Sequence, residues 1–174
     1  MMNDLKRIKA VAMDVDGVMT DCKLWMDASG EWRRSFCIRD GIGIKRLIKA
    51  GYHVGFITGT RSQDIQARVK VLGVPYLADG IEDKEEAFEA FAKQAGCTLE
   101  EVAYIGDDLP DIPLLKTCGF SATVPAAVEE VLAVANYVTK REGGEGAVRE
   151  LCDLIFKNGH FSDAPTAKKK NQQG

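Results

Sequence analysis

Short apolar runs alternate with helix-like segments along nearly the whole chain, and this alternation is the feature that most constrains its fold. The apolar runs lie at residues 8–13, 54–57, 102–105 and 120–124, with a weaker candidate at 137–138. Short, mostly apolar runs are typical of strands covered on both faces. Strands that alternate with helices predict an α/β fold, with a Rossmann-like, mainly parallel sheet and helices on both faces.

Amphipathic segments with recognisable ends lie between these runs. Ser62 can cap a helix that Gly73 ends, and Gly96 ends a second helix. Apolar residues recur in both at helical spacing, namely Ile65, Val69 and Leu72 in the first and Phe88, Phe91, Ala92 and Ala95 in the second. Further helices are expected at residues 43–50, 111–117, 126–135 and 147–157.

Residues 23–37 interrupt the alternation. They contain two short extended pieces around Asp27-Ala28-Ser29-Gly30, which predicts a β-hairpin inserted after the first strand. The large apolar side chains of this segment are Leu24, Trp25, Met26, Trp32 and Phe36. Two explanations stay open for them: they pack on their own domain, or they bury against another subunit.

The length of 174 residues suits one domain with a single core. We expect this domain to span residues 1–159. Residues 160–174 are polar and contain three consecutive lysines, which predicts a flexible C-terminal tail.

Charge and cysteine usage exclude some classes of protein. The net charge of −3 gives no reason to expect a nucleic-acid partner, although one or two local cations can still hold a phosphate. The five cysteines show no C-x-x-C spacing, which is typical of free thiols in a reducing compartment. Neither a signal peptide nor an apolar run of roughly 18 residues is present. The sequence therefore predicts a cytoplasmic protein without a membrane partner.

Two carboxylates follow the first predicted strand. Asp14 and Asp16 stand two residues apart before Gly17, and ligands in open α/β sheets bind outside the carboxyl ends of the strands. Neighbouring carboxylates repel each other, and a divalent cation relieves that repulsion. Carboxylate and carbonyl oxygens suit Mg²⁺ rather than zinc. Asp107 follows a later strand, and it completes a metal cage if the two strands are neighbours.

Two further features suit a phosphate. Thr58-Gly59, just past an apolar run, offers a hydroxyl and accessible backbone N–H groups. Lys84 begins a helix, where the helix dipole also favours an anion. Each feature alone also has a plain explanation as a turn, a loop or a solvated helix face. Their order along the chain, each at a strand end or a helix start, favours a phosphate site.

This ordered set closely resembles the motifs of the haloacid dehalogenase superfamily, over residues 8–150. The resemblance implies a phosphoric monoester hydrolase in which Asp14 is the nucleophile. Asp16 would be the general acid for the leaving alcohol and then the base for water, and Thr58 and Lys84 would hold the phosphoryl oxygens. A second Asp favours phosphoester hydrolysis over dehalogenation, because a halide leaving group needs no proton.

The resemblance also implies a metal site. Mg²⁺ would be bound by Asp14, the backbone carbonyl of Asp16, and Asp107. Asp108 or Asp111, in the stretch Gly-Asp-Asp-Leu-Pro-Asp, would have a supporting role.

Superfamily members usually carry a cap domain, for which the segments 16–58 and 58–84 leave no room. The chain resembles one capless family, the 3-deoxy-D-manno-octulosonate 8-phosphate phosphatases of lipopolysaccharide biosynthesis. The matching stretches are residues 14–21, the hairpin, and residues 39–43, 106–111 and 143–150. The resemblance implies a homotetramer with hairpins gathered at its centre, and it favours the intersubunit explanation for the hairpin's aromatic residues.

The same resemblance implies a small phosphorylated sugar acid as substrate. Gly59, Arg39, Arg61 and Arg149 are the candidates for binding it, and surface positions for the arginines stay open. One departure is Thr60, where members of the family often have Arg. Two alternatives therefore remain: a phosphatase of a nine-carbon sialic-type sugar 9-phosphate, and a catalytically silent scaffold of the same fold.

Overall fold

Six parallel strands form the centre of the molecule in the computed structural model, which describes residues 4–160. Their order is β5-β4-β1-β6-β7-β8. The strands are β1 (Ala10–Met13), β4 (His53–Thr58), β5 (Tyr76–Asp79), β6 (Val102–Ile105), β7 (Phe120–Thr123) and β8 (Tyr137–Val138). The chain builds outward from β1 through β4 to β5 and then crosses back to β6. This is the predicted Rossmann-like sheet, and its switch point lies beside β1, where such folds bind ligands.

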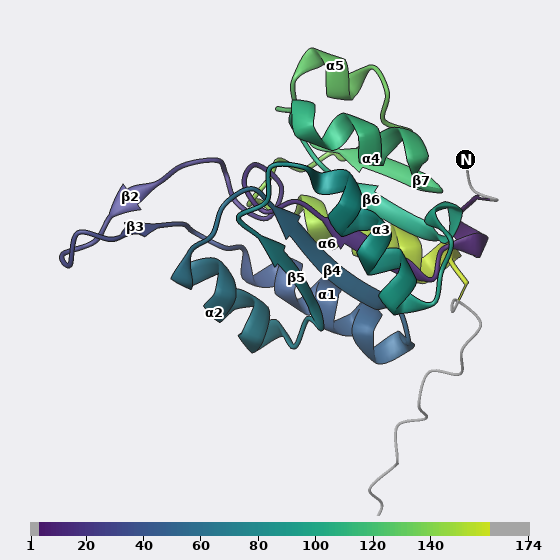
Figure 1. The fold of residues 1–174 in the computed structure, drawn as a ribbon, viewed down its shortest axis with the longest axis horizontal. Coiled ribbons are helices and arrows are strands. Elements are labelled where there is room, and N and C mark those ends of the chain that lie inside the picture. The colour runs from purple at the N-terminus through teal and green to yellow at the C-terminus, as the bar shows by residue number, and fades with distance from the viewer. Residues whose placement is uncertain (1–3, 161–174) are drawn as a thin grey trace, which may run out of the picture.

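Helices cover both faces of the sheet (Figure 1). On one face α1 (Ile38–Ala50) packs against α6 (Ala147–Asn158), and on the other α3 (Lys84–Ala95) lies beside α4 (Ile112–Thr117). The remaining helical elements are α2 (Gln63–Leu72), α5 (Glu129–Leu132) and the 3₁₀ turns η1 (Asp4–Arg7), η2 (Leu99–Glu101) and η3 (Leu109–Asp111). Only a hairpin and α1 separate β1 from β4, so the described residues include no cap domain, as predicted.

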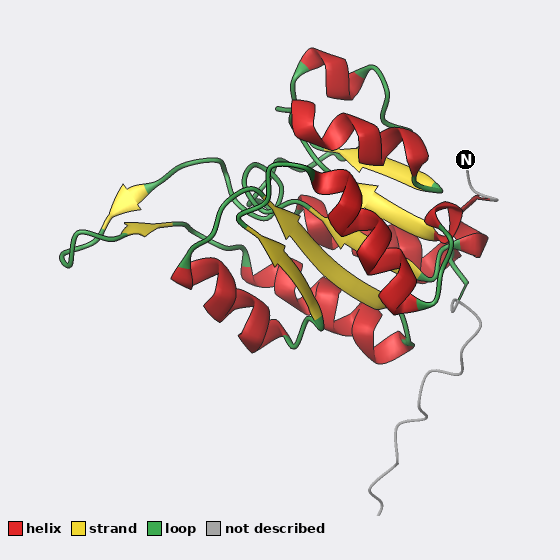
Figure 2. Cartoon of the chain, viewed as in Figure 1, coloured by secondary structure: helices red, strands yellow, loops and turns green. Residues whose placement is uncertain are grey.

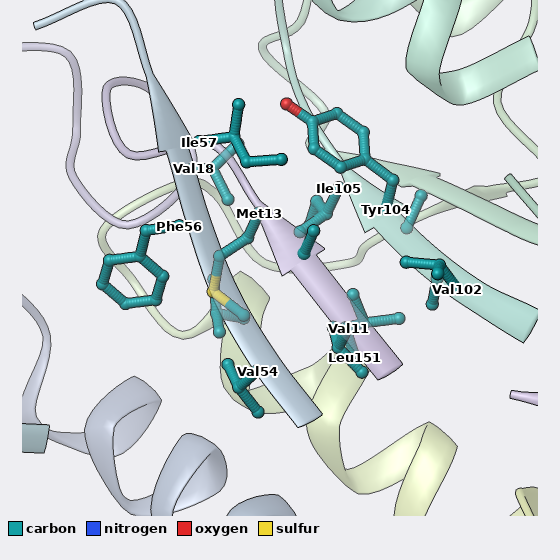
Figure 3. Packing of buried hydrophobic residues seen from close by; sticks show 14 of the residues in the cluster. Val11, Met13, Val18, Val54, Phe56, Ile57, Val102, Tyr104, Ile105 and Leu151 are labelled. Carbon is teal, nitrogen blue, oxygen red and sulfur yellow. The ribbon is translucent and has the colours of Figure 1, made fainter. Parts of the chain in front are cut away.

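The core follows the middle strands. Side chains of β1, β4 and β6 interleave with Leu151 from α6 (Figure 3). Val11, Val54 and Val102, one from each of these strands, are fully buried. Because both faces of these strands are covered, apolar residues occupy successive positions rather than alternate ones. This packing holds the carboxyl ends of the three strands in fixed positions.

The structure corrects several predicted boundaries. β5 was not predicted, because its four residues are only half-buried and give no apolar run. α1 begins at Ile38 rather than at residue 43, and α5 is shorter than the predicted 126–135. Gly73 and Gly96 end their helices in the left-handed conformation, as predicted. Ser62 stands at the N-cap of α2 but makes no capping bond there, since its hydroxyl donates to Asp64 instead.

The predicted hairpin is present and projects from the body of the molecule (Figure 2). It consists of the antiparallel strands β2 (Trp25–Met26) and β3 (Trp32–Arg33). Packing on the hairpin's own domain was the wrong explanation for four of its apolar residues, because between 50% and 55% of each stays exposed: Leu24, Trp25, Met26 and Trp32. Phe36 alone packs against the core. The predicted tail falls mainly on residues 161–174, outside the described residues.

Candidate active site

The predicted acidic residues meet at the carboxyl end of the sheet. Asp14 directly follows β1, and Asp107 comes two residues after β6. These strands are hydrogen-bonded neighbours, with Met13 paired to Ile105. The backbone N–H of Asp14 donates to the Ile105 carbonyl at 3.0 Å, which continues the ladder into the site. The sheet itself therefore fixes the position of the Asp14 carboxylate.

Lys84 links the Asp14 carboxylate to that of Asp111, in the loop after β6. It is the first residue of α3, and its side chain is 7% exposed. Its Nζ donates to Asp14 Oδ1 and to Asp111 Oδ1, both at 2.7 Å. Burial alone would lower the pKa of Lys84, but the two carboxylates outweigh it and raise the pKa, so the ammonium stays charged.

Asp111 organises the loop after β6. Its Oδ1 accepts from Lys84 and from the hydroxyl of Tyr104 at 2.6 Å, and its Oδ2 accepts from the N–H groups of Asp107 and Asp108 at 3.0 and 3.2 Å. These four bonds use about all the lone-pair positions of a carboxylate. Asp111 therefore supports the site, whereas Asp108 is exposed and accepts from the N–H of Leu109 at 2.7 Å.

The Asp14 and Asp107 carboxylates fit a divalent cation. Oxygens of Asp14, Asp107 and Asp111 lie within 4.8 Å of one another. Burial raises the pKa of Asp14 and of Asp107, and neighbouring carboxylates raise both further against the charge of Lys84. A bound Mg²⁺ would offset this crowding of negative charge. With Asp111 occupied by its own donors, Asp14 and Asp107 are the side chains left to hold the ion.

Glycines bring the surrounding loops close. Gly17 has a φ of +84°, and a Cβ there would lie 1.9 Å from Oδ2 of Asp107. A Cβ on Gly143 would lie 1.7 Å from the carbonyl oxygen of Gly17, and one on Gly144 would lie 2.6 Å from the backbone nitrogen of Asp21. The glycine-rich stretch after β8 thus packs directly on the loop that carries Asp14 and Asp16.

Asp16 lies beside Asp14 but has different partners. Its Oδ1 accepts from Nε of Arg34 at 2.5 Å. Its Oδ2 accepts from Nη2 of Arg34 at 3.2 Å and from the hydroxyl of Thr60 at 2.9 Å. Asp14 therefore faces the ammonium of Lys84, while Asp16 is held by a guanidinium and a hydroxyl.

A cavity of about 440 Å³ opens over these groups. It is lined by the predicted catalytic residues Asp14, Asp16, Thr58 and Lys84, together with Gly59 and Asp107. Thr58 is buried, and its hydroxyl accepts from the N–H of Thr60 at 3.2 Å. The structure thus brings together every predicted catalytic and metal-binding residue in one cavity, where carboxylates, a hydroxyl and an ammonium group face the same space.

The comparisons with known proteins agree with this geometry. A family model described as haloacid dehalogenase-like hydrolase matches residues 78–151. A 3-deoxy-D-manno-octulosonate 8-phosphate phosphatase of Yersinia pestis is 43% identical over 149 residues, which cover 86% of this chain and 80% of that protein. The chain belongs to the octulosonate 8-phosphate phosphatase family. A member from Haemophilus influenzae is 42% identical, with 90% of this chain and 87% of that protein covered.

A solved structure of an octulosonate 8-phosphate phosphatase matches the whole fold. The enzyme is from Moraxella catarrhalis, in complex with magnesium ion, phosphate ion and a KDO molecule. It superimposes with a TM-score of 0.88 at 39% identity, and the match covers 94% of each chain. The fold and the capless architecture are those of this phosphatase family.

The three arginines expected at the sugar acid do not line the catalytic cavity of the chain. Arg61 is largely exposed and pairs with Asp79 at 3.1 Å. Arg39 and Arg149 line a separate cavity of about 620 Å³ along α6. Sugar binding by these arginines stays a prediction, and within one chain Arg39 and Arg149 open onto this other cavity.

Sequence reasoning missed two partners of Asp16. The sequence indicates Arg34 only as part of the hairpin, and Thr60 only as the place of a missing Arg. Neither has a motif, because each reaches Asp16 from a different loop of the folded chain. The supporting role of Asp111 was indicated by its position three residues after Asp108, because the two residues form a capping box over one turn.

Proposed function

We propose that this chain hydrolyses 3-deoxy-D-manno-octulosonate 8-phosphate to the free sugar acid and phosphate, through an aspartyl-phosphate on Asp14. One observation carries the proposal: the Asp14–Lys84 pair lies in one cavity with Asp107 and Asp16. Membership in a family whose named members act on this compound supports the choice of substrate.

The first half-reaction forms a bond between Asp14 and phosphorus. An oxygen of Asp14 attacks, and the bond between phosphorus and the sugar oxygen breaks. Lys84 and the hydroxyl of Thr58 hold the phosphoryl oxygens, and Lys84 offsets the repulsion between the carboxylate and the phosphate. Mg²⁺ held by Asp14, Asp107 and the Asp16 carbonyl would neutralise further charge on the phosphoryl group.

Asp16 moves the protons. In the first step it gives a proton to the departing sugar oxygen, a contribution worth about 10²–10⁴ in rate. In the second step it takes a proton from water, which attacks the phosphorus of the aspartyl-phosphate. The bond from Asp14 to phosphorus breaks, phosphate leaves, and both carboxylates return to their starting states.

The proposal extends to the setting of the enzyme. We place it in the cytoplasm and in lipopolysaccharide biosynthesis, as a homotetramer assembled through the hairpin. The exposed tryptophans of the hairpin support assembly, because large apolar side chains gathered on one projection are typical of an interface. In the described residues no helix is long and apolar enough to cross a membrane.

A phosphate-release assay tests the proposed function. With Mg²⁺ present, octulosonate 8-phosphate should be hydrolysed well ahead of a nine-carbon sialic-type sugar 9-phosphate and of simple hexose phosphates. Asp14→Asn should abolish turnover while the circular dichroism spectrum stays unchanged. More than a trace of activity in that variant would rule out the aspartyl-phosphate route.

Thr60 is the reason to test a second substrate, the nine-carbon sialic-type sugar 9-phosphate. Thr60 stands where family members often have Arg, and its hydroxyl is bonded to Asp16. A preference for the nine-carbon phosphate would retain the chemistry and change the substrate. Absence of any Mg²⁺-dependent turnover in folded protein would favour the silent scaffold.

A further inference from the structure

Arg34 links the hairpin to the proposed acid–base residue. It directly follows β3 on the return from the hairpin, yet its side chain is only 4% exposed. The guanidinium donates to both oxygens of Asp16, in the two-pronged arrangement that fixes a carboxylate most firmly. Surface ion pairs contribute little because both groups are solvated and mobile. The Arg34 side chain is instead buried and makes two hydrogen bonds to one carboxylate.

A second layer of contacts holds Arg34 itself. Its Nη1 lies 3.3 Å from the Ser62 hydroxyl and 3.5 Å from Asp64 Oδ1, and its backbone N–H donates to Asp64 Oδ2 at 2.9 Å. These contacts tie the base of the hairpin to the start of α2. The direction of the guanidinium is therefore set by the start of α2 as well as by the hairpin.

The hydrogen bonds to the Asp16 carboxylate leave one of its acceptor positions free. A carboxylate offers about four acceptor positions, and three are used here: two on Oδ2, by Arg34 and Thr60, and one on Oδ1, by Arg34. The remaining position is on Oδ1. Asp16 also lines the catalytic cavity, where the leaving oxygen and the attacking water would be.

We propose that Arg34 is a positioning residue for the acid–base chemistry, which together with Thr60 fixes the Asp16 carboxylate and leaves one site on Oδ1 for the transferred proton. This inference rests on the proposed function. Arg34 itself touches neither the phosphate nor the nucleophile, since its side chain bonds only to Asp16, Ser62 and Asp64 among the residues that the structure describes.

The leaving group distinguishes this role from a structural one. A primary alkoxide needs a proton to depart, whereas 4-nitrophenolate departs without one. A misplaced acid should therefore slow alkyl phosphates far more than aryl phosphates. The quantity to compare is kcat/KM, because it reports the steps up to release of the first product and excludes the shared hydrolysis of the aspartyl-phosphate.

The decisive experiment compares Arg34→Gln with the unchanged protein on octulosonate 8-phosphate and on 4-nitrophenyl phosphate. We expect kcat/KM to fall about 10-fold to 100-fold on the alkyl ester, within the range of acid catalysis, and about 3-fold or less on the aryl ester. Arg34→Lys should recover part of the loss. Thr60→Val, which removes the other donor and keeps the backbone, should show a smaller loss of the same kind.

Arg33→Gln is the matched control. Arg33 is the neighbouring arginine on the hairpin, and it pairs at 2.7 Å with Asp27 of the hairpin itself. Its loss should leave both rates unchanged.

Equal losses on both esters in Arg34→Gln and Thr60→Val would overturn the positioning role, as would unchanged rates. Failure of the proposed function looks different. In that case the unchanged protein would hydrolyse neither ester in the presence of Mg²⁺, and the inference would fall with it.

Discussion

At the scale of single residues, the proposed metal site depends on the absence of a side chain at Gly17. Its φ of +84° favours glycine, and a Cβ there would overlap the Asp107 carboxylate. We expect Gly17→Ala to require at least about 10-fold more Mg²⁺ for half-maximal activity, since displacing a metal ligand weakens binding by at least as much as losing a supporting contact. Titration of phosphate release with Mg²⁺ measures this, and calorimetry of Mg²⁺ binding gives a readout independent of turnover.

Gly30 provides the control for that substitution. Its φ of +85° is almost the same, but a Cβ added there, in the hairpin turn, would meet nothing within 4 Å. Gly30→Ala therefore carries the same backbone strain, about 1–2 kcal/mol, without the overlap. If both variants change Mg²⁺ dependence equally, the overlap with Asp107 is not the cause.

The sequence predicted the residues of the site better than their partners. Asp14, Lys84 and Asp107 could be found because each follows a strand or begins a helix, and parallel strands bring their carboxyl ends to one edge. Arg34 and Thr60 could not be found, because their contacts with Asp16 depend on how two loops fold back over the sheet. A partly buried ion pair between separate loops leaves no periodic pattern in the sequence.

At the scale of secondary-structure elements, the contact between α1 and α6 contains a buried carboxylate, that of Asp40. Asp40 in the first turn of α1 is fully buried, and its Oδ1 accepts from the N–H of Arg149 in α6 at 2.7 Å. Its Oδ2 has no hydrogen-bond partner among the described residues. Burial raises the pKa of Asp40 to about 6, while the N–H and charge of Arg149 and the charge of Arg68 oppose the rise and Glu145 adds to it.

This shift predicts that Asp40→Asn stabilises the fold at neutral pH. The folded-state pKa lies above the unfolded value, so ionisation of Asp40 destabilises the fold above about pH 6, and the cost disappears as the pH falls towards 4. We expect a gain of about 1–3 kcal/mol at pH 7–8 that shrinks steadily below pH 6. Urea unfolding of both proteins across this range measures the difference, and a gain independent of pH would contradict the explanation.

Element boundaries were predicted where local chemistry sets them and missed where tertiary packing does. The left-handed glycines ended α2 and α3 at the predicted residues. α1 begins earlier than predicted because Asp40 is buried against α6, a contact that the helical pattern does not contain. β5 is an edge strand paired only with β4, so its half-buried residues lack the apolar signal of the inner strands.

At the scale of the whole molecule, the hairpin is the feature that the single chain leaves unexplained. Two tryptophans on it are more than half exposed. We expect Trp25→Glu with Trp32→Glu to lower the molecular mass in solution, measured by sedimentation or light scattering, because charges disfavour a buried apolar contact. Val71→Glu, on an exposed apolar position of α2, should leave the mass unchanged. An unchanged mass in the double variant would exclude the hairpin as the assembly surface.

Periodicity and turn residues predicted the parallel sheet and the hairpin. The missing cap was predicted from the resemblance to the superfamily, because the segments 16–58 and 58–84 leave no room for a cap. The sequence left open where the hairpin's apolar residues would lie. A side chain that packs on its own domain and one that packs against another subunit have the same appearance in a sequence. The arginines were uncertain for the same reason. Arg39 and Arg149 lie near the ends of helices that meet on one face, and only the folded chain shows that they line a different cavity.

The close fit of the glycine-rich stretch against the loop that carries Asp14 and Asp16 has a consequence for genetics. Gly143 carries no functional group, yet even a methyl group there would collide with the backbone of Gly17. A screen for inactive alleles would therefore recover substitutions at Gly143 alongside those at Asp14. Tolerance to mutation in this enzyme follows the distance between backbones as closely as it follows the chemistry.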